Sequence, residues 1–294
     1  RTPRMDERSA LRRLAAALPA AGDDAAVVDD LVVTTDMLHE TTDFPTGTTR
    51  YTAGWRAVGA SLSDVAAMGA DATAAVAAYA APTLEEPELD AFVAGAVDVC
   101  KLAGSEYVGG DLDTASEFTV TTTAVGETDA PVRRSGATPG EAVCVTGSLG
   151  RTAAGLGAFD AGDVDRGNDL FRFPPRVDAG VALAPHATAM MDSSDGLARS
   201  LHQLAAASGV GFDVDRAAVP VHDAVADYVG SDGDRWDMAA TVGEDFELVC
   251  TLPPEAVAAA RDAVAVDLSV IGEVTADGVT ADGEPLADEG YTHE

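Results

Sequence analysis

The chain has 294 residues, 47% of them hydrophobic, so it is long and apolar enough for two globular domains and is not a disordered acidic segment. Its formal net charge of -32, from 50 acidic against 18 basic residues, excludes the basic surface that non-specific nucleic-acid binding requires. The acids are spread along the chain and Lys101 is the only lysine, which favours adaptation to multimolar salt, where hydrated carboxylates keep a surface soluble.

The first half of the chain alternates helix and strand patterns. Its clearest helix covers 52–68, because apolar residues recur at spacings of three and four from Trp55 to Val65 and Gly69 follows. A strand at 106–108 is expected to enter a Gly-Gly turn at 109–110. The elements predicted in order are a helix over 7–18 ended by Pro19, strands at 25–28 and 31–35 joined by a turn at Asp29 and Asp30, the helix over 52–68, a strand at 72–79, a helix over 87–103, the strand at 106–108 and a strand at 117–127.

A linker divides the chain. Residues 133–143, "RRSGATPGEAV", have the Ser, Gly, Thr and Pro density of a connecting segment, so we place a domain boundary near 138, giving domains 1–138 and 139–294. Strands and helices also alternate in the second half, which predicts α/β or α+β sandwiches. Its predicted elements are a strand entering a helix at 142–150, a strand, acidic loop and helix over 187–209, and strands at 245–252 and 268–274 with a helix over 254–265 between them.

Acidic residues gather at the ends of the predicted elements. Most are solvated surface in a chain this acidic, but Asp64 lies one position from the apolar stripe of its helix, and Asp111 and Asp192 each follow an apolar strand. Asp24 and Asp36 are expected at one end of the hairpin, where two carboxylates would repel each other. Carboxylates held together call for cations, and hard oxygen ligands favour Mg²⁺. The five segments that contain these acidic residues are Asp24, 34–36, 62–64, 109–111 and 192–195.

Several magnesium ions suit a polyphosphate substrate, because metal ions bridge phosphate oxygens during phosphoryl transfer. The usual nucleotide-binding loops are nevertheless absent from the sequence. It contains no G-x-x-x-x-G-K-[ST], and no H-R-D or D-F-G motif of protein kinases. The segment "GSLGRTAAG" at 147–155 is glycine-rich and follows a strand, but it has no lysine. The residues alone therefore predict metal-dependent phosphate chemistry without a standard nucleotide loop.

Taken together, the motifs resemble the thiamine-monophosphate kinase family. They stand in that family's order from about Gly22 to Tyr291, and the blocks "LSDVAAMGA" and "GEDFEL" are specific to it. The matching motifs are "GDDAAV", "VTTDM", "AGWRAVGASLSDVAAMGAD", "VGGD", "RRSGATPGE", "VTGSLG", "MMDSSDGLARSLHQLA" and "GEDFEL". The broader superfamily of aminoimidazole-ribonucleotide synthetase, selenophosphate synthetase and the hydrogenase-maturation dehydratase is similar in its scattered aspartates but not in this combination.

The resemblance implies a two-domain α/β (α+β) fold like that of aminoimidazole-ribonucleotide synthetase, with an N-terminal sheet that forms a barrel across a homodimer and a C-terminal α/β sandwich. It implies ATP-dependent phosphorylation of thiamine monophosphate to thiamine diphosphate by direct in-line transfer, with ATP between the domains. No dedicated catalytic base is expected, since the acceptor phosphate is already anionic. Carried over residue by residue, Mg²⁺ would be bound by Asp24, Thr34, Thr35, Asp36, Asp64, Asp111, Asp192 and Asp195; ATP by Gly110, Asp111, Arg134 and Ser194; and the thiamine moiety by Glu244 and Tyr291.

Two places depart from the family pattern. Asp43 stands where the family usually has a histidine associated with the acceptor, so we include Asp43 in the substrate-binding set. It could bind another magnesium ion, contact the cationic thiazolium or aminopyrimidine end, or point into solvent from a mobile loop. Phe44 keeps the family's aromatic residue, and His39 is a candidate substitute donor. Leu112 and Asp113 replace the threonines that usually follow "GGD".

Alternatives to this kinase are open. A selenophosphate synthetase would need a catalytic cysteine in its N-terminal glycine-rich segment, and none precedes Cys100. A hydrogenase-maturation protein would end in a cysteine-containing tail, whereas this sequence ends in "YTHE". A non-catalytic nucleotide- or cation-binding protein on the same fold is the third alternative, although the aspartates and Arg134 are intact.

Cysteine content and hydropathy indicate the compartment. Cys100, Cys144 and Cys250 are odd in number, widely spaced and set among apolar residues, which predicts three reduced core thiols rather than a metal or redox site. No run approaches a membrane span, and the first twenty residues contain "DER" where a signal peptide would be apolar. We therefore expect a cytoplasmic protein without membrane or nucleic-acid partners.

Overall fold

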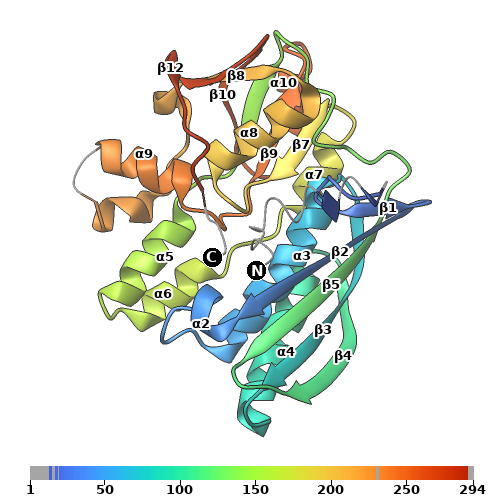
Figure 1. Cartoon of the computed structure of the whole chain (residues 1–294), viewed down its shortest axis with the longest axis vertical. Coiled ribbons are helices and arrows are strands. Elements are labelled where there is room, and N and C mark those ends of the chain that lie inside the picture. Colours follow the sequence, from blue (N-terminus) through green and yellow to red (C-terminus); the bar gives the residue numbers. More distant parts are fainter. Residues whose placement is uncertain (1–12, 15–16, 19, 230–231, 291–294) are drawn as a thin grey trace, which may run out of the picture.

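The structure is a computed structural model that describes residues 13–14, 17–18, 20–229 and 232–290. The helix predicted over 7–18 lies largely outside the described residues, and so does Tyr291. Two mixed sheets with helices packed against them make up the described part, as the α/β pattern predicts (Figure 1).

The first sheet has five strands and is covered by helices on one face. Its order in space is β1 (Ala26–Val28), β2 (Leu31–His39), β5 (Thr119–Glu127), β3 (Asp71–Ala81) and β4 (Glu106–Thr114). Strands β3 and β4 are parallel, whereas the other neighbours are antiparallel. Helices α3 (Arg50–Ala67) and α4 (Glu86–Leu102) pack against each other and cover the sheet, and the short helix α2 (Glu40–Asp43) follows β2. The predicted helices over 52–68 and 87–103 are thereby confirmed.

Two strands run further than the sequence predicts. β2 extends to His39, so residues 34–36 lie in the middle of a strand rather than at its end, because the whole of β2 pairs with β5. β4 continues through 109–111, so the predicted Gly-Gly turn is wrong. The glycine at 110 is required by packing instead: a Cβ there would lie 1.7 Å from the carbonyl oxygen of Ala77 on β3.

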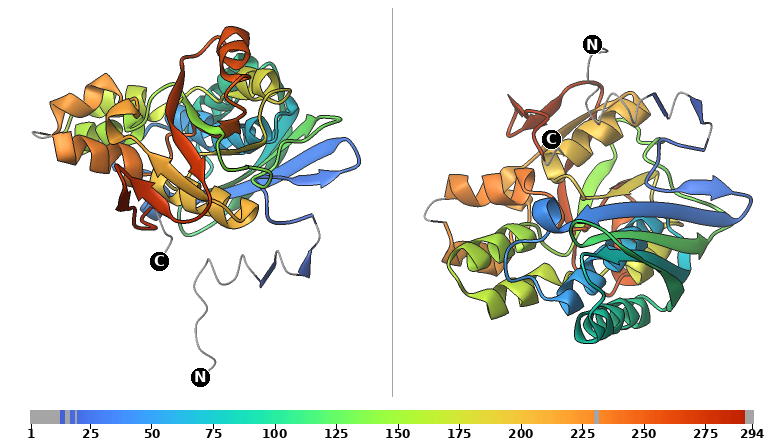
Figure 2. Two further views of the ribbon diagram at one scale, coloured as in Figure 1. Left: turned by 90° about the horizontal axis from the view of Figure 1, so that it is seen from above. Right: turned by 60° about the horizontal axis from the view of Figure 1, so that its bottom comes forward.

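The second sheet has seven strands in the order β12-β11-β8-β10-β6-β9-β7. These strands are β12 (Glu284–Pro285), β11 (Val279–Ala281), β8 (Gly211–Val214), β10 (Leu268–Thr275), β6 (Ala142–Thr146), β9 (Leu248–Leu252) and β7 (Ala189–Asp192). Its helices are α5 (Arg151–Asp160), α6 (Val164–Phe171), α7 (Val177–Leu183), α8 (Leu197–Ser208), α9 (Asp232–Thr241) and α10 (Val257–Ala263), with 3-10 turns at Arg216–Ala218 and Asp223–Asp227. Helices α5, α6 and α9 group on the side away from the β1–β2 hairpin in all three ribbon views (Figure 2).

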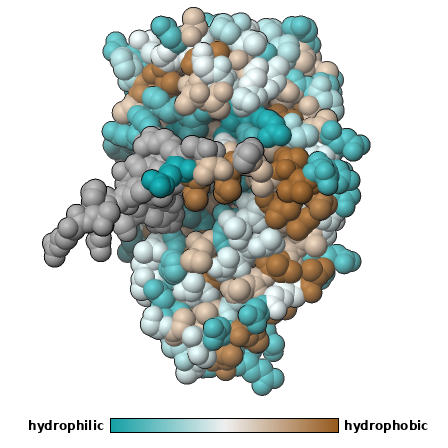
Figure 3. Space-filling view, turned by 45° about the vertical axis from the view of Figure 1, so that its right-hand side comes forward, coloured by the Kyte–Doolittle hydropathy of each residue, from teal (hydrophilic) through white to brown (hydrophobic). Residues whose placement is uncertain are grey.

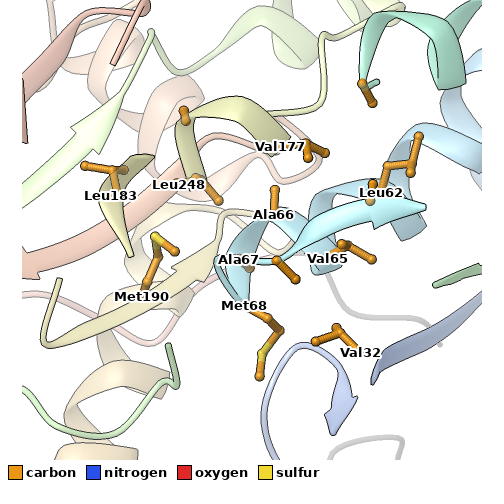
Figure 4. Packing of buried hydrophobic residues seen from close by; sticks show 14 of the residues in the cluster. Val32, Leu62, Val65, Ala66, Ala67, Met68, Val177, Leu183, Met190 and Leu248 are labelled. Atoms are coloured by element: carbon orange, nitrogen blue, oxygen red, sulfur yellow. The ribbon is translucent and has the colours of Figure 1, made fainter. Parts of the chain in front are cut away.

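The two halves share one hydrophobic core. Figure 4 shows Ala67 of α3 and Met68, the residue that follows this helix, between Val32 of β2 and Met190 of β7. Leu62 and Leu248, from opposite halves, are both fully buried in this cluster. Each such side chain contributes roughly 1.5–3 kcal/mol through its burial. Helix α3 is therefore held by both halves. The boundary near residue 138 falls between β5 and β6 and stays a prediction.

The three cysteines are free and buried, as predicted. Cys144 of β6 lies directly opposite Cys250 of β9 in the antiparallel register. Among the described residues, no helix combines the length and the apolar character needed to cross a membrane.

The outer face of the first sheet is left open by the described helices. Exposed hydrophobic side chains on it include Met37 of β2, Val76 of β3 and Val108 of β4. Figure 3 shows hydrophobic residues gathered on the side of the molecule that carries these strands. Strand β4 is also an edge strand, with unpaired backbone groups along one side.

Candidate active site

Four aspartates from both halves of the chain meet beside α3, and we call them the aspartate cluster: Asp24, Asp36, Asp64 and Asp192. Asp24 precedes β1, and Asp36 lies on β2. On β2 the pleat puts Thr34 on the buried face with Val32, and Asp36 has the same parity. Asp64 projects from α3, and Asp192 is the last residue of β7. Strand alternation and the packing of α3 against β2 and β7 therefore create the cluster.

A hydroxyl group donates a hydrogen bond to each of three of these carboxylates. Thr34 Oγ1 donates to Asp64 Oδ2 at 2.5 Å. Ser61 Oγ donates to Asp36 Oδ2 at 2.6 Å, and Ser63 Oγ donates to Asp192 Oδ2 at the same distance. The sequence interpretation missed both serines, although Ser63 is part of "LSD" and Ser61 directly precedes it on the helix that carries Asp64. These bonds fix the carboxylate rotamers and leave further oxygen lone pairs available.

Burial and mutual repulsion make the cluster unfavourable as a set of bare anions. Carboxylate oxygens of Asp24, Asp64 and Asp192 lie within 4.8 Å of one another. Burial raises the pKa of Asp64 well above its usual range, and the charges of Asp36, Asp192 and Asp24 add to this. Burial and the charge of Asp24 raise the pKa of Asp192 to about 7. Asp192 Oδ1 is buried without a hydrogen-bond partner. An oxygen-only donor set of this kind fits a hard divalent cation.

Arg134 binds one member of the cluster with both arms of its guanidinium. Its Nε and Nη2 donate to the two oxygens of Asp24 at 3.1 and 2.9 Å. Burial lowers the pKa of Arg134, but the Asp24 charge and hydrogen bonds outweigh it, so the net shift is upward. Next to it, Asp23 accepts from the Arg134 backbone N–H at 2.9 Å and pairs with Arg133 at 2.8 Å. The linker arginines therefore anchor the segment before β1.

The loop after β7 carries Ser194 and Asp195, which sequence analysis assigned to ATP and magnesium. Asp195 is partly exposed and lies 3.9 Å from Arg199 of α8. The Ser194 carbonyl accepts from the Glu244 backbone N–H at 2.6 Å. The Ser193 hydroxyl is buried without a hydrogen-bond partner. This loop therefore connects the aspartate cluster to residue 244 of the "GEDFEL" block.

Three predicted site residues are not brought to the cluster within one chain. Thr35 lies on the opposite face of β2 from Thr34, and its hydroxyl donates to the Thr122 carbonyl at 2.8 Å. Gly110 and Asp111 lie on β4, and the register from Asp111 through β3 and β5 ends at Met37 of β2. Three strand spacings put Asp111 about 14 Å from β2. The metal roles of Thr35 and Asp111 stay predictions.

A polar cavity of about 710 Å³ lies between the 40–48 segment and the second half of the chain, where Thr152, Phe171 and 242–244 line it. It contains both Asp43 and Glu244, so the structure brings together two of the three residues predicted to bind the acceptor. Arg50, also in its wall, is paired with Glu40 at 2.8 Å. The third predicted residue, Tyr291, lies outside the described part of the chain.

Asp43 is not a solvent-facing residue of a mobile loop, so that alternative is wrong. It is the last residue of α2 and is 7% exposed. Its Oδ2 accepts from the His39 backbone N–H at 2.6 Å and from the Thr42 hydroxyl at 2.8 Å. The His39 ring instead contacts the Thr119 hydroxyl at 3.0 Å. Asp43 thus organises the turn at the end of β2 while lining the cavity.

The glycine-rich segment at 147–155 is not a phosphate loop. Its helix, α5, has its N-terminus capped by Asp245, whose carboxylate accepts from the Gly150 and Thr152 N–H groups at 2.5 and 2.9 Å. A carboxylate of the chain itself therefore occupies the position where an anionic ligand would sit. Burial raises the pKa of Asp245 to about 7 in spite of these bonds.

Comparison with known proteins finds similarity over both halves. Residues 22–128 match the family model described as AIR synthase related protein, N-terminal domain, and residues 138–282 match the corresponding C-terminal domain. The chain is 63% identical over 291 residues to a thiamine-monophosphate kinase from Halobacterium salinarum, covering 98% of this chain and 100% of the relative. It is 39% identical over 300 residues to another from Methanospirillum hungatei, covering 98% and 99%. The solved structure of AaThiL complexed with AMPPCP and TMP gives a TM-score of 0.90 at 28% identity, covering 100% of this chain and 99% of that one.

Proposed function

This chain belongs to the thiamine-monophosphate kinase family, and we propose that it transfers the terminal phosphoryl group of ATP to thiamine monophosphate, giving thiamine diphosphate. A relative of the same fold is complexed with an ATP analogue, AMPPCP, and with TMP. The observation that carries the proposal is the aspartate cluster, where three carboxylates approach within 4.8 Å. A cavity large enough for the acceptor is lined by Glu244, whose backbone N–H donates to the carbonyl of Ser194 in the loop after Asp192.

Mg²⁺ fits the aspartate cluster. Asp24, Asp64 and Asp192 would hold it, because their oxygens converge and Asp192 Oδ1 has no protein donor. Asp36 adds a fourth carboxylate beside them, and Thr34 and Asp195 belong to the same proposed metal-binding set. Thr35 lies on the opposite face of β2, so its proposed metal role would need a site on that face. When bound, Mg²⁺ supplies positive charge that neutralises phosphate oxygens during transfer.

Apart from Mg²⁺, phosphoryl transfer would be assisted by the charge and the position of protein groups. Arg134 donates two hydrogen bonds to Asp24 and interacts electrostatically with Asp64 and Asp192. It therefore provides a permanent positive charge at the cluster. Ser194, in the loop after Asp192, would contact the nucleotide phosphates. No side chain of the cluster has to remove a proton, since a phosphate monoester oxygen is already a competent nucleophile.

The thiamine end of the acceptor suits the polar cavity. Its wall carries Glu40, Asp43 and Glu244 together with the aromatic rings of Phe44 and Phe171. A cationic thiazolium ring is attracted by such acids and packs on aromatic faces. Asp43 would then replace the family's histidine by attracting the cationic end rather than donating to phosphate.

The nucleotide base suits a second, more apolar groove of about 460 Å³ beside Gly110 and Asp111. Tyr79, Phe92 and Tyr107 line it, and Tyr107, which is partly exposed, would offer ring surface to a purine.

A homodimer would complete this site. The outer sheet face and the β4 edge are open, and pairing two sheets there would cover Met37, Val76 and Val108. Asp111, which is too distant to reach the aspartate cluster of its own chain, lies on this open sheet and stays in the proposed metal-binding set. The same pairing would form the expected barrel across the dimer.

The composition supports a high-salt solvent and a cytoplasmic location. The charge of -32 and the scarcity of lysine support adaptation to high salt. Three free cysteines are typical of a reducing interior, which supports the cytoplasm as the place of action.

The direct test incubates the purified chain with ATP, MgCl₂ and thiamine monophosphate in about 2 M KCl, where charge repulsion is screened to a few ångströms. Chromatography should show thiamine diphosphate and ADP in equal amounts, with neither formed when Mg²⁺ is withheld. ATP consumption that does not depend on thiamine monophosphate would point to another enzyme of the superfamily. No ATP consumption with any acceptor would support the non-catalytic alternative.

A further inference from the structure

Arg56 of α3 is a charged side chain buried in the first half of the chain that reaches into the second. It is 0% exposed, and its Nη1 donates to the Phe171 carbonyl at 2.9 Å. The guanidinium carbon lies 3.9 Å from the centre of the Phe171 ring. Burying a guanidinium is costly unless a carboxylate and well-placed acceptors compensate for lost water. The groups that compensate the buried charge of Arg56 therefore indicate its role.

The carboxylate that pairs with Arg56 is Glu244, at 2.7 Å between Nη2 and Oε2. Arg56 Nε is buried without a hydrogen-bond partner. The guanidinium is therefore oriented for its bond to Glu244, although this leaves one of its own donors unpaired. The Glu244 side chain is 24% exposed and lines the polar cavity. One end of this ion pair is thus buried and the other faces the cavity.

The backbone at Glu244 is held in an unusual conformation. Its φ is +67°, a left-handed value that costs a residue with a side chain free energy and persists only where its surroundings impose it. The Thr152 hydroxyl donates to the Glu244 carbonyl at 2.7 Å, and the Glu244 N–H donates to the Ser194 carbonyl at 2.6 Å. These contacts fix the main chain of Glu244, and Arg56 fixes its side chain.

Helix α3 also links this pair to the aspartate cluster. Arg56 and Asp64 are eight residues apart on α3, a separation of about 12 Å along the helix axis. One rigid element therefore sets the distance between the metal-binding end and the Glu244 end of the site. An extended acceptor with its phosphate at one end and its rings at the other matches this arrangement.

We propose that Arg56 is a positioning residue for the acceptor: by pairing with Glu244, it aims that carboxylate at the thiamine end of thiamine monophosphate. The inference rests on the proposed function and adds a residue to it. Arg56 touches neither substrate. It holds one oxygen of Glu244 and neutralises part of its charge, which leaves the carboxylate oriented to accept from an N–H donor or to face a cationic ring.

The test compares Arg56→Met, Glu244→Gln and the double variant with the wild type, measuring kcat and both Michaelis constants in high KCl. Loss of a charge-assisted hydrogen bond predicts a rise of about tenfold in KM for thiamine monophosphate. The KM for ATP should stay within about twofold of wild type, a change smaller than one such bond produces. Because Arg56 acts through Glu244, the double variant should be no worse than Glu244→Gln. Arg56→Lys should recover most of the loss.

Arg172→Met is the matched control. Arg172 likewise joins the two halves, since it donates to the Thr52 hydroxyl at 3.3 Å, but within the described residues it makes no hydrogen bond to Glu244. Its removal should leave both Michaelis constants unchanged. If Arg56→Met does not fold, Arg56→Gln, which keeps an N–H donor without the charge, takes its place in the same comparison.

Equal changes in both Michaelis constants, or additive losses in the double variant, would overturn the inference and leave Arg56 with only a structural role. Both constants at wild-type values would overturn it as well. These outcomes differ from failure of the proposed function, in which the wild-type chain itself forms no thiamine diphosphate.

Discussion

Replacing Asp192 by asparagine tests whether the aspartate cluster is built for cations. Asp192 is fully buried at the end of β7, with Asp24 and Asp64 within 4.8 Å and one oxygen unpartnered. Without Mg²⁺, its ionised form is unfavourable in the folded protein. Asp192→Asn should therefore stabilise the metal-free chain and, at the same time, abolish kinase activity.

The magnitude follows from the raised pKa. Its pKa is raised from 3.8 to about 7, so the favourable contribution of the protonated form is complete below about pH 4 and is lost as pH rises through about 7. At pH 8 the ionised carboxyl costs the folded state at most about 4 kcal/mol, at about 1.4 kcal/mol per pH unit. Asparagine removes this cost but leaves a polar amide to be paired, so we expect a melting temperature higher by about 5 °C.

The assay is thermal unfolding followed by circular dichroism at pH 8, in high KCl, with EDTA and then with a Mg²⁺ series. The wild type should gain stability with Mg²⁺, by about 2.7 kcal/mol at a hundred times its dissociation constant, and the variant far less. Asp71→Asn, at an exposed aspartate where β3 begins, should change neither curve. A variant less stable than wild type in EDTA, or one that Mg²⁺ stabilises equally, would refute the reasoning.

Four other outcomes are expected. Asp64→Asn and Asp36→Asn should each lower turnover about 100-fold or more with unchanged circular dichroism, because they remove electrostatic stabilisation rather than core volume; near wild-type turnover in both contradicts the metal site. The melting temperature should rise steeply between about 0.1 M and 3 M KCl as the screening length shortens from about 10 Å to below about 3 Å, and a flat curve contradicts salt adaptation. Asp43→Ala should raise KM for thiamine monophosphate several-fold and spare that for ATP, whereas unchanged constants would remove Asp43 from the acceptor site. Since burial raises the pKa of Asp245 to about 7, wild-type stability should fall as pH rises from about 4 to about 7, and Asp245→Asn should fall less steeply in parallel unfolding experiments; identical pH profiles would contradict this.

Much of the site's scaffold was predictable from local pattern. The helical spacing around Asp64 identified α3, and the apolar run before Asp192 identified β7. The hairpin turn at Asp29 and Asp30 was also correct, since Asp29 takes the left-handed conformation that such turns favour. These features depend on residues close together in the chain, so sequence periodicity and turn chemistry carry them.

Strand limits were not predictable in the same way. The extension of β2 to His39 depends on pairing with β5, where Thr119, 80 positions later in the sequence, lies opposite His39. The passage of β4 through two glycines depends on β3, against which only a residue without a Cβ fits at Gly110. Local propensity predicted a strand end and a turn at these places, and tertiary hydrogen bonding overrode both.

What the sequence determined by itself was the set of chemical groups: acids next to apolar elements, a strongly acidic composition, and family motifs in order. What only the tertiary structure decided was which of those groups meet. Arg56 and Glu244 are 188 positions apart, and no local pattern indicates that a buried arginine of α3 pairs with a cavity-lining acid. Asp43 likewise resembles a surface residue in sequence, yet backbone and hydroxyl donors at the end of β2 hold it out of solvent. Long-range packing decides such pairs because desolvation and hydrogen bonding depend on neighbours in space, not along the chain.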